Sequence, residues 1–494
     1  MVGARSPYNL LEKASEGLEG PKGGVMADEK FSQKVLRVAI IGSGPSGFYA
    51  AEALLKQKEI PVEVDLFDRL PTPYGLVRGG VAPDHQKIKA VAAVYEKISQ
   101  LPGFRFFGNV QLGQELQVSD LKERYHQIVY AVGAEKDRAM GIPGEDASGS
   151  HSATAFVGWY NAHPDYRDQK FDLSSESAAI VGVGNVAIDV ARILAEDPEI
   201  LAKTDIADYA LEALRRSQIK TLYLLGRRGP AQAAYSPAEI KELGSLTTAD
   251  LVVREEEARL DEASKTDYLD SENKKNVDYV QAQARMGEGK KPRKIRLRFC
   301  VSPVEILVEN GRVRGLKIEK NRLISDENGK PKAVGTGQFE VLPVGLVFRS
   351  VGYRGAPIPG VSFDAKSGKI PNQEGRVLSG ESKSLCLGEY VVGWAKRGPS
   401  GLIGTNRADS VATVKGMLED ALAGKFGWTI SPVHQPAFME QFLRERRCRF
   451  VSFADWKKLD QVEIEEGKKK GKTREKFSRV SDMLSALDSA VGTA

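Results

Sequence analysis

The sequence predicts an α/β protein with two interleaved Rossmann-like dinucleotide-binding domains. Two glycine-rich fingerprints each follow an apolar, strand-like run and precede a helical pattern: Gly42-Ser43-Gly44-Pro45-Ser46-Gly47 and Gly182-Val183-Gly184-Asn185-Val186-Ala187. In such motifs the first two glycines allow a tight turn and close approach to a pyrophosphate, and the third small residue lets helix and strand pack. A chain of 494 residues has room for two or three domains. Two fingerprints in the correct context therefore predict two bound dinucleotides.

The first unit consists of a strand at 35–41, a helix at 46–56 and a strand at 62–67. We expect Gly42, Gly44, Pro45, Ser46 and Gly47 to contact the cofactor. The second strand ends at Asp68, where a carboxylate can accept the ribose hydroxyls of an unphosphorylated dinucleotide such as FAD. The alternative is that Asp68 is only a solvated strand end.

The second unit has a strand at 178–181, a helix at 185–195 and a strand at 220–225. Here Arg227 and Arg228 replace the acid at the strand end. Guanidinium groups match a phosphate in charge and geometry, which favours the 2′-phosphate of NADP(H). The alternative is an ordinary solvated basic pair. The first site is thus predicted to bind FAD and the second NADPH.

Composition and missing motifs narrow the chemistry. The net charge is +5, and no apolar run approaches the length of a membrane span. The three cysteines are too far apart for a redox-active pair, and the five histidines are scattered, so we predict neither disulfide reduction nor a metal site. Residues 1–34 are mixed in charge rather than acid-poor, so we expect a disordered extension and find no clear transit peptide.

Several long strings resemble those of the adrenodoxin reductase family, the mitochondrial-type NADPH:ferredoxin reductases and their bacterial relatives. They are VAIIGSGPSGFYAAEALL, DRLPTPYGLVRGGVAPDH, FVGWYNAHP, GVGNVAIDVARIL, GRRGPAQAAYSPAEIKEL and GWAKRGPSGLIGTN. The resemblance implies a glutathione-reductase-like architecture and a mitochondrial location. It also implies hydride transfer from NADPH to FAD, then single-electron transfer to a [2Fe–2S] ferredoxin that feeds cytochromes P450 or iron–sulfur cluster assembly.

The resemblance also implies site residues. On the flavin side these are Leu76, Val81, Trp394, Gly401, Leu402 and Ile403. On the NADPH side they are Gly184, Asn185, Val186, Arg227, Arg228 and Glu239, with Trp394 and Gly401 near the nicotinamide. A glycine-rich turn that opens a helix near 405–418 would direct its positive end at the flavin and stabilise the anionic reduced form.

Three titratable residues are expected at the reacting centre: His85, Asp189 and Glu239. By resemblance, Glu239 accepts from the nicotinamide carboxamide, and the alternative is a helix-surface acid. His85 and Asp189 are expected to approach each other across the domain interface beside the flavin. Either they take part in proton transfer or flavin tuning, or they form a structural hydrogen bond.

A basic run at 290–298 suggests a docking surface for an acidic ferredoxin, and Lys241 matches a docking position of the family. Nucleic acid is the usual alternative for such a run, but the resemblance disfavours it. Ile295, Leu297 and Phe299 alternate as in a strand, so part of the run is alternatively the solvated face of a sheet. We expect a monomer that associates with membranes at most peripherally.

The predicted domain order is an FAD domain at 35–137, an NADP domain at 138–345, and the second part of the FAD domain with the C-terminal tail at 346–494. Two other functions stay open. One is the electron-input subunit of a glutamate synthase, which the dispersed cysteines disfavour. The other is a non-catalytic NADPH-binding scaffold, which would be colourless, whereas the intact flavin motifs predict a yellow protein.

Overall fold

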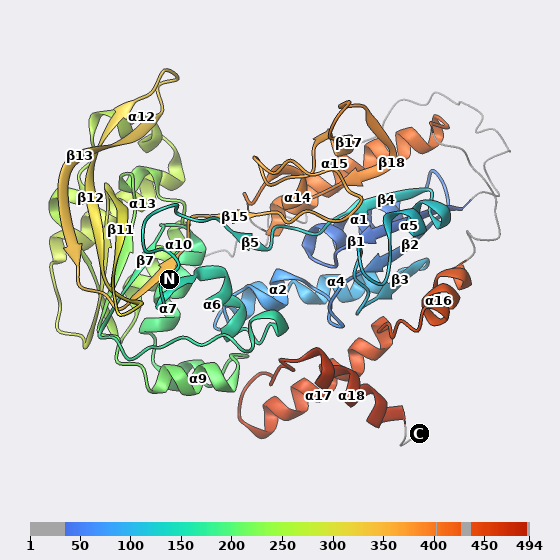
Figure 1. Cartoon of the computed structure of the whole chain (residues 1–494), viewed down its shortest axis with the longest axis horizontal. Coiled ribbons are helices and arrows are strands. Elements are labelled where there is room, and N and C mark those ends of the chain that lie inside the picture. Colours follow the sequence, from blue (N-terminus) through green and yellow to red (C-terminus); the bar gives the residue numbers. More distant parts are fainter. Residues whose placement is uncertain (1–34, 402, 426–435, 492–494) are drawn as a thin grey trace, which may run out of the picture.

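Two β-sheets, one in each half of the molecule, form the framework of the structure (Figure 1). The first is mostly parallel with an antiparallel edge, and the second is parallel. The computed structural model describes residues 35–401, 403–425 and 436–491. Each sheet contains a strand, β1 (Leu36–Ile41) in the first and β7 (Ser177–Val181) in the second, that leads directly into one of the glycine fingerprints. The predicted α/β fold with two Rossmann-type units is confirmed. The predicted disorder of residues 1–34 lies outside the described residues.

The first sheet takes its strands from both ends of the chain, in the order β16-β17-β18-β4-β1-β2-β3. Strand β1 is apolar and buried at five of its six positions because both faces of the sheet are covered. Val38 and Ile40 pack into one core cluster, and Ala39 and Ile41 into another. The strands are β1 (Leu36–Ile41), β2 (Val62–Phe67), β3 (Phe104–Phe107), β4 (Gln127–Tyr130), β16 (Asn372–Gln373), β17 (Arg376–Leu378) and β18 (Leu385–Val391).

The second sheet is parallel throughout, in the order β6-β14-β7-β8-β10-β9. Helices pack against one face, and an antiparallel three-stranded sheet packs against the other. Its strands are β6 (Ser150–Ser152), β7 (Ser177–Val181), β8 (Thr221–Leu225), β9 (Ala249–Val253), β10 (Arg293–Arg298) and β14 (Leu346–Arg349), and the covering strands are β11 (Val301–Glu309), β12 (Arg312–Ser325) and β13 (Pro331–Leu342).

The chain crosses between the two halves twice, and the two crossings run side by side. Strands β5 (Lys136–Asp137) and β15 (Tyr353–Arg354) pair antiparallel in the middle of the molecule (Figure 1). The first crossing falls at the predicted boundary. The second falls later than predicted, because β14 pairs with β6 and β7 and extends the second sheet to Arg349, past the predicted boundary at 345.

The helices cover the sheets and frame the space between them. Helices α1 and α15 lie side by side on the first sheet, where the Ser410 hydroxyl donates to the Ser46 carbonyl at 2.9 Å. In the first half the helices are α1 (Pro45–Lys56), α2 (Leu76–Gly79), α3 (Gln86–Lys89), α4 (Ala92–Ser99), α5 (Val118–Arg124), α14 (Trp394–Arg397) and α15 (Ile403–Leu422). In the second they are α6 (Ala153–Tyr160), α7 (Asn185–Ala195), α8 (Pro198–Leu201), α9 (Asp208–Arg215), α10 (Pro237–Ser245), α11 (Glu255–Ala258), α12 (Lys265–Tyr268) and α13 (Ser271–Met286).

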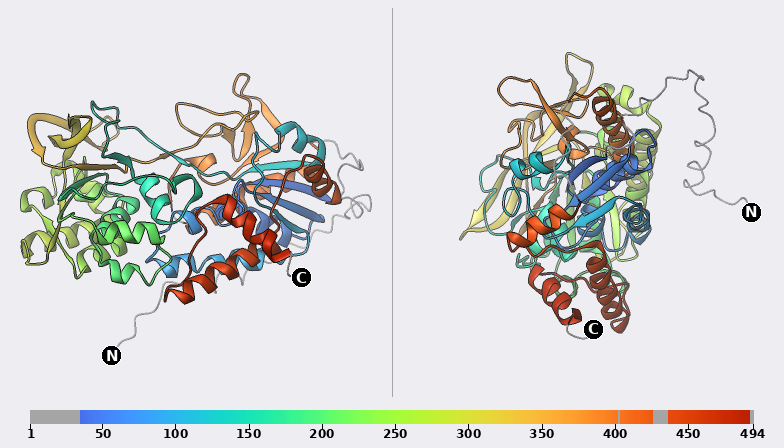
Figure 2. Two further views of the ribbon diagram at one scale, coloured as in Figure 1. Left: turned by 60° about the horizontal axis from the view of Figure 1, so that its bottom comes forward. Right: turned by 90° about the vertical axis from the view of Figure 1, so that its right-hand side faces the viewer.

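The C-terminal helices α16 (Pro436–Glu445), α17 (Phe453–Lys469) and α18 (Val480–Val491) lie along one edge of the molecule, outside both sheets (Figure 2). The segment between α17 and α18 binds the second half through Lys476, whose side chain is 1% exposed. Its ammonium lies 2.9 Å from the Asp205 carboxylate, which also accepts from Lys89 at 2.7 Å. These two contacting cations hold the pKa of Asp205 well below its ordinary value. No helix in the described part of the chain is long and apolar enough to cross a bilayer.

We expect Asp205→Asn to lower the free energy of unfolding by about 3–5 kcal/mol, because two buried ammonium groups lose their counter-charge. Denaturant titration followed by circular dichroism measures this change. Asp168→Asn is the matched control: Asp168 pairs with Arg479 of the same tail, but both side chains are exposed. The control should unfold like the unmodified protein. Equal stability of all three proteins would contradict a structural role for the buried cluster.

Candidate functional site

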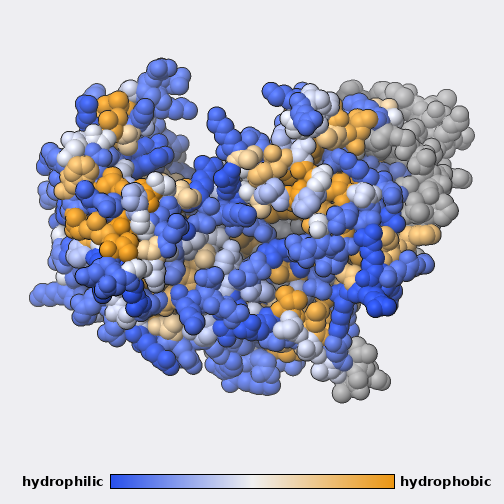
Figure 3. Space-filling view, viewed as in Figure 1, coloured by the Kyte–Doolittle hydropathy of each residue, from blue (hydrophilic) through white to orange (hydrophobic). Residues whose placement is uncertain are grey.

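A single cavity of about 1660 Å³ lies between the two sheets and is lined by both glycine fingerprints. Pockets for single small ligands measure roughly 300–1,000 Å³, so a cavity of this volume has room for two dinucleotides. The space-filling view shows the surface hollowed between the two lobes, with hydrophilic residues over much of the rim (Figure 3). The cavity lies at the carboxyl ends of β1 and β7, where ligands of open parallel sheets bind.

The first fingerprint is shaped for close approach of backbone and ligand. Gly42 has φ +107°, and a Cβ there would lie 2.5 Å from the carbonyl oxygen of Ala131, just beyond β4. A Cβ on Gly47 would lie 2.1 Å from the Gly42 oxygen, so the third glycine permits helix and strand to pack. By contrast, no heavy atom lies within 4 Å of a Cβ built on Gly44. The turn is tightly enclosed by protein on one side and open toward the cavity on the other.

The second fingerprint repeats this arrangement. Gly182 has φ +132°, and a Cβ there would lie 2.2 Å from the carbonyl oxygen of Ser350, which follows β14 as Ala131 follows β4. Gly184 faces open space, with its nearest neighbour at 3.9 Å. Helix α7 then begins at Asn185, whose amide oxygen accepts from the Ser236 backbone at 2.8 Å. Both turns therefore place a helix N-terminus at the cavity, which suits a pyrophosphate.

Asp68 lines the cavity at the end of β2, as predicted, and is tied to the first fingerprint. Its carboxylate accepts from the Ser43 backbone at 2.9 Å, from the Ser43 hydroxyl at 2.5 Å and from the Leu70 backbone at 3.0 Å. These bonds fix the side chain beside the turn, so it is not a freely solvated strand end. Whether it binds a ribose stays a prediction.

Arg227 and Arg228 line the cavity at the end of β8, the position in the second unit that corresponds to Asp68. Among the described residues, neither guanidinium has a carboxylate within 4.0 Å. Burial and the adjacent charge of Arg227 lower the pKa of Arg228. Two neighbouring cations without a counter-ion, facing a cavity, form a site for an anion.

The predicted flavin-side residues Leu76, Val81, Trp394, Gly401 and Ile403 also line the cavity, while Leu402 lies outside the described residues. Helix α15 begins at Ile403 and is longer than the predicted 405–418.

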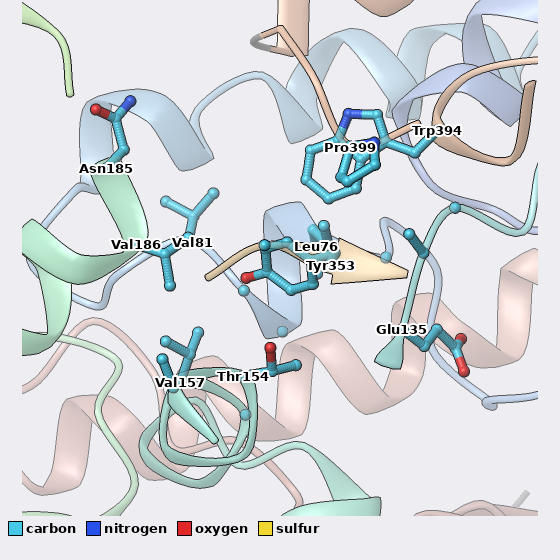
Figure 4. A pocket seen from close by; sticks show the side chains of 18 of the residues that line it. Leu76, Val81, Glu135, Thr154, Val157, Asn185, Val186, Tyr353, Trp394 and Pro399 are labelled. Carbon is cyan, nitrogen blue, oxygen red and sulfur yellow. The ribbon is translucent and has the colours of Figure 1, made fainter. Parts of the chain in front are cut away.

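Tyr353, from the second crossing strand, also lines the cavity, near Trp394 (Figure 4). Its ring centre is 5.5 Å from that of Trp394, and burial raises the pKa of its hydroxyl to about 12. Sequence reasoning missed Tyr353, because a strand of only two residues, β15, has no periodicity that could identify it.

His85 projects from the first half against carboxylates of the second. Its Nδ1 lies 3.8 Å from Asp189, as the predicted pair requires, and its Nε2 lies 3.8 Å from Glu239. The closest contact, 2.9 Å, is instead with Glu242, which sequence reasoning did not single out. The prediction of no metal site stays open, because donor atoms of His85, Glu239 and Glu242 lie within 4.8 Å of one another.

The environment of Glu239 favours its protonated form. Burial and then the negative charge of Asp189 raise its pKa to about 7, against the opposing charges of His85 and Arg192. Burial also raises the pKa of Asp189, which is only partly offset by Arg192. A carboxyl that titrates near neutral pH in a cavity is typical of a functional site. Glu239 is therefore not an ordinary helix-surface acid.

The predicted basic docking run is wrong as a continuous surface. Strand β10 lies inside the second sheet, between β8 and β9. Its successive side chains point to opposite faces of the sheet and cannot form one continuous surface. The strand alternative therefore describes most of the run. Three of the run's six cations pair with carboxylates: Lys294 with Asp250 at 2.6 Å, Arg296 with Glu288 at 3.1 Å, and the buried Arg298 with Glu257 and Glu340, each at 2.8 Å. Lys241 is exposed on α10 and, in the described part of the chain, has no carboxylate within 4.0 Å.

Comparison with known proteins identifies the family. Residues 36–216 match the model for pyridine nucleotide-disulphide oxidoreductases. The chain is 44% identical over 462 residues to NADPH-ferredoxin reductase FprA of Mycobacterium leprae, covering 90% of this chain and 97% of the relative. It is 41% identical over 467 residues to the mitochondrial NADPH:adrenodoxin oxidoreductase of Arabidopsis thaliana, covering 92% and 96%. The chain belongs to the adrenodoxin reductase family.

A solved structure of a family member agrees with this assignment. Mycobacterium tuberculosis FprA in complex with NADPH superposes with a TM-score of 0.87 at 42% identity, covering 92% of this chain and all of that one. The adrenodoxin reductase fold therefore extends over nearly the whole chain. FAD and NADP(H) are therefore the cofactors of the present chain, and the two glycine turns that open toward the cavity fit them.

We expect the Glu239 carboxyl to gain its proton near pH 7, because burial disfavours its charged form. An infrared titration of the protein minus that of Glu239→Gln isolates this group. Glu212→Gln, which removes an exposed carboxylate of α9, is the control and should leave the midpoint unchanged. A midpoint near the ordinary value of 4.5 would contradict the assignment.

Proposed function

We propose that the chain is an FAD-containing NADPH–ferredoxin reductase that takes hydride from NADPH and passes single electrons to a [2Fe–2S] ferredoxin. The observation that carries the proposal is the single cavity joining two glycine turns. The strand after one turn ends in an acid. The corresponding strand after the other ends in two arginines, and neither of these has a carboxylate within 4.0 Å among the described residues. This asymmetry supports a different dinucleotide at each site, and the shared cavity places the two sites next to each other.

The cofactor supplies the electron chemistry: bound FAD takes a hydride from NADPH and gives one electron to each of two ferredoxins, leaving NADP⁺ and one proton. The chain's own residues bind and orient. The N-termini of α1 and α7 hold the pyrophosphates, and Asp68 accepts from a ribose hydroxyl. Arg227 and Arg228 bind the 2′-phosphate, and Glu239 accepts from the nicotinamide carboxamide. The N-terminal end of α15 favours negative charge on the flavin.

Two alternatives receive less support. A glutamate-synthase input subunit carries cysteine-ligated iron–sulfur centres, whereas Cys300, Cys386 and Cys448 are free and belong to different parts of the fold. A scaffold without flavin would have no reason to keep the open turn at Gly44 or the anchored Asp68. The colour of the purified protein separates this second alternative from the reductase.

The partner surface and the compartment are proposed at a coarser level. We infer that an acidic ferredoxin docks to a monomer beside Lys241, and that its electrons feed cytochromes P450 or iron–sulfur cluster assembly. Peripheral membrane association and a mitochondrial location are proposed by family resemblance. The Arabidopsis relative is named as mitochondrial, and the other relative named above is mycobacterial.

We expect Arg228→Gln to raise the KM for NADPH by roughly tenfold to hundredfold, because a charged hydrogen bond to phosphate is worth about 1.5–3 kcal/mol. The kcat/KM for NADH should stay unchanged, since NADH has no 2′-phosphate. Steady-state reduction of ferricyanide with each coenzyme measures both values. Arg215→Gln is the control, because Arg215 of α9 pairs with Glu199 of α8 and both side chains are exposed. An equal loss with both coenzymes would contradict 2′-phosphate recognition.

An acidic [2Fe–2S] ferredoxin should strongly stimulate cytochrome c reduction by NADPH. The stimulation should fall as ionic strength rises, because salt screens charge steering between the partners. Lys241→Glu should weaken it, while NADPH-dependent ferricyanide reduction continues. A yellow, NADPH-reducible protein that shows no stimulation would retain the flavin chemistry and exclude this partner.

A further inference from the structure

We propose that Arg192 is a positioning residue for hydride transfer: its guanidinium holds the His85 loop and the Glu239 carboxylate in one geometry across the domain interface. The proposal rests on the proposed function, because it concerns the site that would receive the nicotinamide. Arg192 lies on α7, the helix that opens with the second fingerprint. It does not line the cavity itself but contacts residues that do.

The Arg192 guanidinium contacts carboxylates from three segments of the chain. Nε donates to Asp84 at 2.6 Å, and Nη2 donates to the other oxygen of Asp84 at 3.0 Å. Nη2 also donates to Asp189 of the same helix at 2.7 Å, and Nη1 donates to Glu239 of α10 at 3.4 Å. The side chain is only 4% exposed. The planar fork of arginine can satisfy such a set of acceptors, and the single ammonium of lysine cannot.

The two bonds to Asp84 cross the interface between the halves. Asp84 directly precedes His85, and His85 is the N-cap residue of the short helix α3. Fixing the Asp84 carboxylate therefore fixes the backbone from which the imidazole projects. Since the same guanidinium also contacts Glu239, the relative placement of His85 and Glu239 depends on Arg192. Displacement of about 1 Å at a reacting centre can cost a hundredfold in rate.

Arg192 also supplies the positive charge that this cluster requires. Glu239 faces Asp189 and Arg192 from α7, His85 from the first half, and Glu242 from its own helix. Asp84 completes the carboxylates, and contact with Arg192 lowers its pKa. Tyr160 of α6 also faces the cluster, but burial raises the pKa of its hydroxyl well above the ordinary value, so it stays neutral. Without Arg192, the negative charges would further favour the protonated form of Glu239.

The test compares Arg192→Lys, Arg192→Gln and Asp84→Asn as FAD-loaded full-length proteins. Equilibrium titration with NADP⁺ from pH 5.5 to about 9, read from the absorbance of the flavin, gives a binding constant that does not depend on turnover. The pH midpoint due to Glu239 is the part that Glu239→Gln abolishes. Stopped-flow flavin reduction at saturating NADPH gives the rate of hydride transfer.

For Arg192→Gln we expect the Glu239 midpoint to move upward by about one unit or more, since a contacting cation is lost. Arg192→Lys keeps the charge, so its midpoint should move less, but its hydride-transfer rate should fall by about a hundredfold. Asp84→Asn should slow hydride transfer without an upward shift. The effects of Arg192→Lys and Asp84→Asn should not add, because either change breaks the same fork.

Lys89→Met is the matched control. Lys89 is a buried cation that also crosses between the halves, through Asp205. Its backbone amide bonds the His85 carbonyl within the same helical turn, but in the described part of the chain its side chain binds Asp205 and Asn161 and makes no hydrogen bond or ion pair with His85 or Glu239. Lys89→Met should leave the Glu239 midpoint in place.

An equal midpoint shift in Lys89→Met would overturn the proposal, because loss of any buried cation at the interface would then have the same effect. Unchanged midpoint and rate in Arg192→Lys and Asp84→Asn would also overturn it. If Arg192→Gln does not fold, these two variants decide the matter. A wild-type protein that NADPH cannot reduce would instead refute the proposed function before any variant is compared.

Discussion

The site depends on how two separately built sheets are held in a fixed relation. Hydride transfer requires the donor and acceptor atoms about 3–3.5 Å apart, yet the two glycine turns that would hold the dinucleotides belong to different halves of the molecule. Within the described residues, the backbone passes between the halves at the paired crossings β5 and β15. Two ionic clusters add to this connection: Asp84 with Arg192 beside the reacting centre, and Lys89 with Asp205 and Lys476 away from it. Buried ion pairs contribute little net stability, but they fix geometry because every alternative leaves a charge without a partner.

Pairing of charges separates ligand sites from structural ones in this molecule. The run at 290–298 is the densest basic stretch that the sequence analysis singled out, but the fold places most of it in an inner strand and pairs three of its six cations with carboxylates. Arg227 and Arg228 are less conspicuous in sequence, and they face the cavity without a carboxylate in contact among the described residues. The density of basic residues is therefore a poor guide to binding here. The informative quantity is the number of charges that the folded chain leaves uncompensated.

Much of this could be predicted from the sequence because the decisive signals are local. A glycine turn between an apolar strand and a helix encodes its own geometry, and Asp68, Arg227 and Arg228 lie just after the second strand of each unit. What sequence reasoning missed depends on tertiary placement. Glu242 and Arg192 each lie near a residue that was predicted, but only the docking of the two halves brings Glu242 to His85 and Arg192 to Asp84. Tyr353 reaches the cavity from a two-residue strand that no periodicity could identify. The boundary at 345 was placed too early because β14 is separated from the crossing by only three residues.

The position of Lys476 near the end of the chain also has a consequence for biosynthesis. Its partner Asp205 is made about 270 residues earlier, and at roughly 5–20 residues per second the ribosome needs on the order of 15–50 s to cover that distance. During this time the nascent inserted half can fold, but its contact surface lacks the final cation. A similar delay applies to β18, which pairs with β4, so the first sheet is incomplete until β18 has been synthesised. A ribosome that stalls late in the message would thus release a chain with one finished half and one incomplete half.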